Sequence, residues 1–212
     1  MRSLPSSIRH ALIVAPHADD EAIGAWGLMD LLHRRGTRLW VIVVSDGAAS
    51  HPGSTTWPPA RLVAERRRET RRAMRFLGVP PSRIRFLGLP DGALVASIVR
   101  RRLRKELLRM PRPDLLVGPV NRDAHADHRA VASALDRHRG LHLRYRVWPA
   151  GTSRSCPMRI PLDLRTRAMK QRVVRSYRTQ TGRITDSPTG MTITAHHLAA
   201  FVRPTEDFQV GS

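Results

Sequence analysis

Short apolar runs alternate with longer amphipathic stretches over the first two thirds of the chain, and this order restricts the fold more than any other feature. The apolar runs are continuous and rich in Val, Ile and Leu, which is typical of strands covered on both faces. We predict strands at 10–15, 39–45, 84–89 and 114–119, and helices at about 21–35, 60–78, 93–109 and 128–139. This alternation predicts a Rossmann-like α/β fold, with an open, mostly parallel sheet, right-handed crossovers and helices on both faces.

The alternation weakens after about residue 150. Residues 150–157 and 182–190 have the composition of loops, whereas 165–180 has that of a helix. The chain has 212 residues, of which 41% are hydrophobic, enough for one core. We therefore predict a single domain over 1–212, in which the residues from about 150 onward form a lid or an edge addition.

The net charge is strongly positive, because 37 Lys and Arg stand against 17 Asp and Glu, which gives +20. A balance of this kind is found in proteins that bind nucleic acid or other anions. Here the arginines are spread along predicted helix faces with few aromatic residues beside them. We interpret them mainly as a solvated basic surface, with a basic rim that attracts an acidic substrate as the alternative. No specific nucleic-acid partner is expected.

Two features bear on the cellular location. No apolar run approaches the ~20 residues that span a bilayer, and the apolar run near the N-terminus is too short for a signal peptide. The one cysteine, Cys156, excludes an internal disulfide and fits a reducing compartment. We expect a cytoplasmic protein without a membrane span. The oligomeric state is not indicated.

Polar side chains collect directly after each of the four predicted strands. The segments concerned are 17–20, 45–47, 90–92 and 121–128. Ligands of an open parallel sheet bind beyond the carboxyl ends of its strands, so these segments are expected to surround a site. We interpret Asp91 and Gly92 as a turn and not as ligands. Trp57, in the loop 50–60, is either a stacking platform for a sugar or a loop anchor.

Three residues form a predicted metal site. His17 and Asp20 are three residues apart across a strand-to-helix turn, so both side chains can reach one point. His128 lies in register with an apolar helix stripe at 131, 132 and 135, and therefore points inward. Two imidazoles and a carboxylate suit Zn²⁺ with a fourth position open to water. We expect one zinc ion per chain, with another divalent metal as the alternative.

Three further residues are predicted to act beside the metal. Asp19 is placed to take the proton of the water, and His125 to act as a cationic or acidic partner. Asp123 or Asp127 could hold the imidazole of His125 in one tautomer and raise its pKa, and on this basis Asp127 is included among the catalytic residues.

Arg66 is the predicted substrate-binding residue. It falls on the inward face of the helix 60–78, where a cation costs desolvation energy unless it is paired. Glu69, one turn on, could supply the pairing and leave guanidinium donors free for a substrate oxygen. A purely structural ion pair between Arg66 and Glu69 is the equal alternative.

With these residues in place, the chain resembles the PIG-L/LmbE-like family of zinc-dependent N-acetylglucosaminyl deacetylases. The motif H-P-D-D-E of that family matches residues 17–21 with alanine in place of proline, and H-x-D-H matches 125–128. The weaker matches are S-D-G at 45–47, R-x-x-E with A and L-G at Arg66, Glu69, Ala73 and 77–78, L-P-D-G at 89–92, and a late pattern at Lys170, Tyr177, Thr179, Gln180, Glu206 and Phe208.

The resemblance implies the same roles for the strongest motifs. Family residues at the positions of His17, Asp20 and His128 hold the metal, and the one matching Asp19 is the general base. The residue matching His125 assists the tetrahedral intermediate or the leaving amine, and an arginine at position 66 contacts substrate in some members. Two departures are Ala18, which lacks the stiffening proline, and Asp123, where some members have a tyrosine that helps hold the oxyanion.

These observations predict a metal-dependent hydrolase that removes an N-acetyl group from an N-acetylglucosamine-type sugar or glycoconjugate. The nearest alternative is a zinc amidase that acts on a longer acyl chain or on a sugar-linked conjugate. A nucleotide- or nucleic-acid-binding module is the alternative from another class. It is disfavoured because no G-x-G-x-x-G or Walker loop follows the first strand, and because 17–21 would repel phosphates without a metal.

Overall fold

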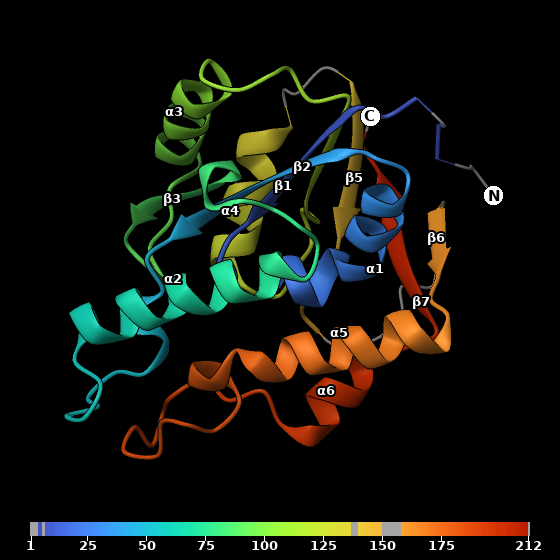
Figure 1. The fold of residues 1–212 in the computed structure, drawn as a ribbon. Coiled ribbons are helices and arrows are strands. Elements are labelled where there is room, and N and C mark those ends of the chain that lie inside the picture. The colour runs from blue at the N-terminus through green and yellow to red at the C-terminus, as the bar shows by residue number, and fades with distance from the viewer. Residues whose placement is uncertain (1–3, 6, 137–139, 150–157, 212) are drawn as a thin grey trace.

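Seven strands form one sheet in the order β3-β2-β1-β4-β5-β7-β6 (Figure 1). The computed structural model describes residues 4–5, 7–136, 140–149 and 158–211. The strands are β1 (His10–Ala15), β2 (Arg38–Ser45), β3 (Ile84–Leu89), β4 (Leu115–Pro119), β5 (Leu141–Tyr145), β6 (Met158–Pro161) and β7 (Thr205–Val210). The first five pair in parallel, and β7 lies antiparallel between β5 and β6.

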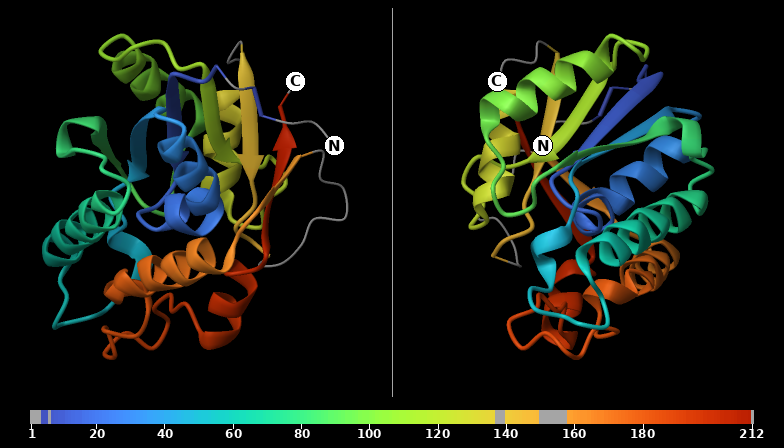
Figure 2. Two further views of the ribbon diagram at one scale, coloured as in Figure 1. Left: turned by 45° about the vertical axis from the view of Figure 1, so that its right-hand side comes forward. Right: turned by 90° about the vertical axis from the view of Figure 1, so that its left-hand side faces the viewer.

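Helices cover both faces of the sheet (Figure 2). They are α1 (Asp20–Arg34), α2 (Pro59–Arg75), α3 (Ala96–Leu107), α4 (Ala126–Leu135), α5 (Leu164–Ser176) and α6 (Ala195–Phe201), with the short 3-10 helices η1 (Ala48–Ser50), η2 (Pro81–Arg83) and η3 (Arg178–Gln180). On β1, residues 11, 13 and 15 join the core under α1, α2 and α5, while 12 and 14 join the core under α3 and α4. The predicted α/β architecture is therefore confirmed.

The element boundaries differ from the predicted ones by a few residues. The helix expected at 128–139 begins at Ala126 and ends at Leu135, so His128 lies in its first turn. The C-terminal addition supplies two antiparallel strands, β6 at the sheet edge and β7 beside it, which the apolar pattern did not reveal, because their more buried residues alternate with more exposed ones and form no continuous apolar run. The predicted loop at 150–157 lies outside the described residues. Among the described helices, none is both long and apolar enough to cross a bilayer.

A buried ion pair supports a kink in α1. The backbone of Ala25 leaves the helical region, which frees amide groups one turn on. Glu206 of β7 accepts hydrogen bonds from the N–H groups of Gly27 and Leu28 at 2.8 and 3.0 Å, and from Lys170 Nζ at 2.7 Å. Both charged side chains are almost fully buried. Lys170 and Glu206 of the late sequence pattern thus stabilise α1, the helix that begins at Asp20.

Replacing Lys170 by methionine is expected to destabilise the protein by about 3–5 kcal/mol, because the Glu206 carboxylate would stay buried without its cation. Urea unfolding followed by circular dichroism measures this loss. Arg175→Met, on the exposed face of the same helix, is the matched control and should change the free energy of unfolding by less than about 0.5 kcal/mol. Equal effects of the two substitutions would contradict the structural role of the pair.

Candidate active site

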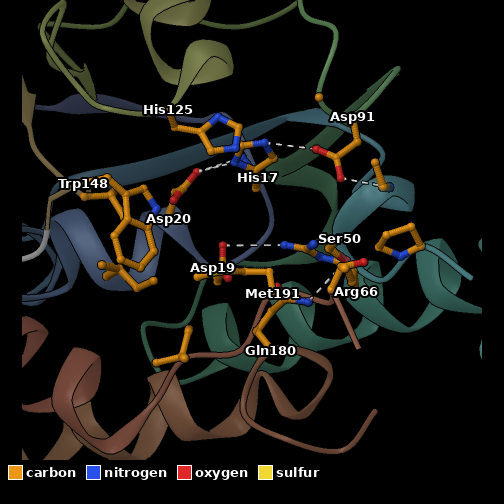
Figure 3. Close-up of a pocket in the computed structure, with 17 residues that line it drawn as sticks. His17, Asp19, Asp20, Ser50, Arg66, Asp91, His125, Trp148, Gln180 and Met191 are labelled. Carbon is orange, nitrogen blue, oxygen red and sulfur yellow. Dashed lines mark hydrogen bonds and ion pairs between the residues drawn. The ribbon is translucent and has the colours of Figure 1, made fainter. Parts of the chain in front are cut away.

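A pocket of about 260 Å³ opens where β1, β2, β3 and β4 end (Figure 3). Loops from both halves of the chain form its walls. The lining residues are His17, Asp19, Asp20, Ile23, Ala49, Ser50, Pro52, Arg66, Asp91, Gly92, His125, Val147, Trp148, Gln180, Thr189, Met191 and Ile193. Five of the seven residues that the sequence assigned to a site therefore line one pocket, and the other two, Asp127 and His128, lie directly behind His17.

The three predicted metal ligands converge on one point. His17 Nδ1 lies 3.2 Å from Asp20 Oδ2 and 3.2 Å from His128 Nε2, and His128 Nε2 lies 3.1 Å from Asp20 Oδ2. All three side chains are buried. Tetrahedral zinc with ligand bonds of about 2.0–2.1 Å holds its ligand atoms roughly 3.3 Å apart, so this triangle fits such an ion. The histidines and the aspartate are also the donor types that zinc prefers.

Carboxylates lie behind both histidines, and those behind His17 can fix the orientation of its ring. His17 Nε2 lies 3.2 Å from Asp127 Oδ2 and 3.1 Å from Asp91 Oδ1. A proton on Nε2 leaves Nδ1 with a free lone pair toward the metal position. His128 Nδ1 lies 3.3 Å from Asp123 Oδ2, although not in hydrogen-bond alignment. Burial alone would raise the pKa of Asp20, but His128 and His17 hold that pKa well below its usual range.

The carboxylate of Asp127 faces His17 and not, as the sequence had suggested, the imidazole of His125. Its carboxylate accepts hydrogen bonds from the N–H groups of Gly92 and Leu94 at 2.8 and 3.0 Å, in addition to facing His17. It does not line the pocket. The geometry makes Asp127 a positioning residue for His17 and for the loop after β3.

Asp19 has a strained backbone that is held by a buried carboxylate. Its φ of 129° is the one positive value among the described residues other than glycine. Such a conformation costs of the order of 1–3 kcal/mol and persists only where the surroundings impose it. Glu21 Oε2 accepts the Asp19 N–H at 3.1 Å, and Tyr177 donates its hydroxyl to Glu21 Oε1 at 2.6 Å. This arrangement turns the Asp19 side chain into the pocket beside Asp20.

Arg66 lies next to Asp19 and does not pair with Glu69 as predicted. Its Nη2 donates to the Ala18 carbonyl at 2.8 Å and lies 3.7 Å from Asp19 Oδ1. Glu69 instead accepts the N–H and the hydroxyl of Thr179 at 3.0 and 2.6 Å, because the next helical turn faces η3. Burial raises the pKa of Asp19 to about 8, against the opposing effect of the Arg66 guanidinium.

The glycine of the S-D-G match, Gly47, leaves space for the side chain of Arg66. Gly47 has a φ of 74°, and a Cβ there would lie 2.8 Å from Arg66 Cδ and Nε. The guanidinium reaches the pocket along this glycine. Arg66 Nε is buried and has no hydrogen-bond partner within the described part of the chain. The close approach of this side chain to Gly47 lets the buried arginine reach the wall of the pocket.

His125 caps α4 and faces His17 and His128, the two histidines of the predicted metal site. Its Nδ1 accepts the N–H of Asp127 at 3.2 Å, which leaves the proton on Nε2. Its ring centre is 4.8 Å from that of His17 and 5.0 Å from that of His128. Burial, followed by those two rings, lowers the pKa of His125. The predicted raised pKa and carboxylate partner are thus wrong, because the carboxylates of Asp123 and Asp127 are turned toward other donors.

Asp91 and Trp148 line the pocket although the sequence analysis did not assign them to the site, whereas Trp57 does not line it. Asp91 forms the predicted turn, with Gly92 at a φ of 76°, yet its carboxylate also faces His17. Trp57 is buried between Arg61 and Arg183, which makes it a loop anchor. The pocket tryptophan is Trp148, whose ring packs edge-on against His197 and Phe201 of α6. No motif or periodicity marks this residue in the sequence.

The family of the chain follows from a match over residues 12–138. The family model described as PIG-L, GlcNAc-PI de-N-acetylase, matches residues 12–138, which is more than half of the chain. The chain belongs to the PIG-L family. The match begins on β1 and ends beyond α4. The matched region therefore contains the three candidate metal ligands, and it also contains Asp19, Arg66 and His125. No curated protein matches the chain.

Solved structures share the fold of this PIG-L protein. N,N'-diacetylchitobiose deacetylase from Pyrococcus horikoshii has a TM-score of 0.77 at 20% identity, over 96% of this chain and 84% of its own. A deacetylase from teicoplanin biosynthesis has a TM-score of 0.63 at 19% identity, over 79% and 83%. GalB, the 4-carboxy-2-hydroxymuconate hydratase from Pseudomonas putida KT2440, has a TM-score of 0.70 at 15% identity, over 96% of each chain. The fold thus occurs in deacetylases and in a hydratase.

Proposed function

We propose that this protein is a metal-dependent hydrolase that removes an N-acetyl group from an N-acetylglucosamine-type sugar or glycoconjugate. The observation that carries the proposal is the convergence of His17, Asp20 and His128 on one point beside the carboxylate of Asp19. The family match supports the same reaction, because its description is a de-N-acetylase. Zinc is the proposed metal, held by these three residues. A cytoplasmic location stays a prediction.

The proposed mechanism begins with proton removal from water. A zinc ion held by the three ligands would polarise the amide carbonyl and lower the pKa of water to about 7. Asp19 accepts the proton of the attacking water, since its carboxylate reaches into the pocket beside Asp20. Arg66 keeps that carboxylate in place through its contact with Oδ1 at 3.7 Å. Arg66 also lines the pocket, and its guanidinium is proposed to bind a substrate oxygen.

The second half of the mechanism uses His125. Its Nε2–H donates to the oxyanion that forms on the former carbonyl oxygen, because Nδ1 is already engaged with a backbone N–H. This assigns a neutral imidazole to the role that the sequence suggested for a cation. Asp19 returns its proton to the departing amine, which completes the transfer. Asp127 acts only through His17 and the loop after β3.

The pocket volume favours one sugar residue. About 260 Å³ lies just below the usual range for sites that enclose a drug-sized ligand, so any aglycone must extend beyond the mouth. An amidase for a longer acyl chain remains the alternative and would need more apolar space than the pocket offers.

The proposal is tested by acetate release. Zinc-loaded protein is incubated with N-acetylglucosamine, N,N'-diacetylchitobiose and N-octanoylglucosamine, and both the freed acid and the new amine are measured. Acetate formed with an equal amount of amine supports the proposal. Release of octanoate without acetate would favour the longer-acyl amidase. No amide cleavage, together with hydration of an unsaturated carboxylate such as the substrate of GalB, would overturn deacetylation.

Replacing Tyr177 by phenylalanine is expected to lower kcat by roughly tenfold with little change in KM. Without the hydroxyl, Glu21 is free to turn and no longer holds the strained backbone of Asp19, so the base is misplaced. Tyr145→Phe is the matched control, since it also removes a buried hydroxyl hydrogen bond, to the Val14 carbonyl at 2.9 Å. Both variants should lose comparable stability. An equal fall of kcat in both would contradict the positioning role.

A further inference from the structure

A groove of about 690 Å³ runs along α3 and across the end of α4, away from the active-site pocket. Figure 2 shows these two helices on the face of the sheet opposite α1, α2 and α5. Ligand sites in proteins commonly measure roughly 300–1,000 Å³, so the groove is large enough for a small molecule. No described residue lines both the groove and the active-site pocket.

The floor and the sides of the groove are apolar. Leu12 and Val14 of β1 and Leu116 of β4 form the floor, and each is almost fully buried. Leu103 of α3 lies along one side. At the mouth, Leu108 is 86% exposed and leaves apolar surface in contact with water. A molecule with an alkyl chain would be stabilised by covering this surface.

Three arginines border the apolar lining. Arg100 donates its Nη2 to the Ser133 carbonyl at 3.0 Å, and so joins α3 to α4. Arg104 and Arg112 are exposed and form no ion pair with any residue that the structure describes. Neighbouring cations without a counter-charge attract anions. The rim of the groove therefore favours a negatively charged head group.

The nearby carboxylates are directed at other partners. Glu106, the acidic residue of α3, pairs with two other arginines at 3.2 and 3.7 Å. Asp114 accepts two backbone N–H groups at and before the start of β1, at 2.8 and 2.9 Å. Asp136 pairs with Arg144 of β5 at 2.6 Å. None of these three carboxylates lines the groove.

We propose that the groove binds a single-chain anionic amphiphile, a free medium-chain carboxylate, with its alkyl chain along α3 and its head group at Arg104 and Arg112. Guanidinium groups bind carboxylate oxygens through paired N–H donors. One alkyl chain is narrow enough to lie in the seam between two helices, whereas a flat bilayer surface would meet only projecting side chains such as Leu108. The inference does not depend on the proposed hydrolase activity, since the groove and the active site have separate linings.

The test measures binding of hexanoate, octanoate and 1-octanol to the zinc-loaded protein by isothermal titration calorimetry. The Kd of octanoate should be roughly tenfold lower than that of hexanoate, because each buried methylene contributes up to about fourfold. The neutral 1-octanol should bind roughly tenfold more weakly than octanoate, since each exposed charge pair contributes up to a few-fold. About 0.5 M NaCl should reduce this difference between acid and alcohol.

Two variants test the two parts of the site. Arg104→Gln, Arg112→Gln should lose the preference for octanoate over 1-octanol and keep the effect of chain length. Arg101→Gln, Lys105→Gln is the matched control, because both side chains are exposed on α3 outside the lining, and it should keep the preference. Ala134→Leu, which fills the groove, should weaken binding of both ligands at least tenfold. Its melting temperature shows whether it is folded, and the charge variants decide the test if it is not.

Four results would overturn the site. One is the same loss of preference in the charge variant and its control. Another is equal Kd values for hexanoate and octanoate, which would mean that only the head group is bound. Loss of octanoate binding when a chelator removes the zinc would place the carboxylate on the metal of the active site. Absence of octanoate binding would also exclude the site, and sedimentation with phosphatidylglycerol vesicles would then identify a membrane surface as the partner of α3.

Discussion

Asp19→Asn is expected to lower kcat by about 10²–10⁴-fold while zinc stays bound. An amide cannot accept the proton of the attacking water, and no other carboxylate of the pocket is free for this task. Asp20 is directed at the metal position, and Asp91 is engaged with His17 and with the Ala49 N–H. The measurement is the initial rate of acetate release, with the zinc content of the same sample determined alongside.

The substitution is chosen to leave the fold intact. Asparagine tolerates a positive φ better than most residues and keeps the N–H that Glu21 accepts. The matched control is Asp46→Asn, in the loop after β2, where the carboxylate accepts the Ala48 N–H and has no place in the proposed chemistry. Undiminished turnover of the Asp19 variant would remove Asp19 from the role of base. A comparable fall in both variants would indicate a loss through loop structure.

The sequence was sufficient for the first four strands and for the convergence of His17, Asp20 and His128 because both depend on local patterns. Continuous apolar runs identify parallel strands, and the rule that sites form at their carboxyl ends brings residues 17–20 and 125–128 together. The helical register of His128 then gives its direction. These are properties of neighbouring residues in the chain, so no tertiary information is needed.

The supporting contacts could not be predicted, since they join residues that are far apart in sequence. Glu69 has a helical register that permits a pair with Arg66, but Thr179 offers it two donors at closer range. The direction of the Asp127 carboxylate depends on the loop after β3, and Trp148 depends on the docking of α6. Packing between segments that are distant in sequence thus decides the partner of Glu69, the direction of the Asp127 carboxylate and the position of Trp148.

A His17→Ala, His128→Ala double variant is expected to lose bound zinc, whereas the wild type should hold about one ion per chain. Asp20 alone would remain of the three ligands, and one carboxylate does not retain zinc. Zinc at 100 times its dissociation constant should stabilise the wild type by about 2.7 kcal/mol and the variant not at all. The measurements are metal analysis of the purified proteins and thermal unfolding with zinc or with a chelator.

His196→Ala, His197→Ala is the matched control for this result, since it removes two histidines from α6, outside the triangle. It should keep the zinc ion and its stabilising effect, which excludes non-specific binding by surface imidazoles. Circular dichroism must show that the His17, His128 variant is folded, because buried side chains are removed. If the wild type binds no divalent metal even when supplied with excess, the triangle at 3.1–3.2 Å is only a hydrogen-bonded cluster. Hydrolysis by the proposed mechanism would then fail with it, because Asp19 would have no activated water to deprotonate.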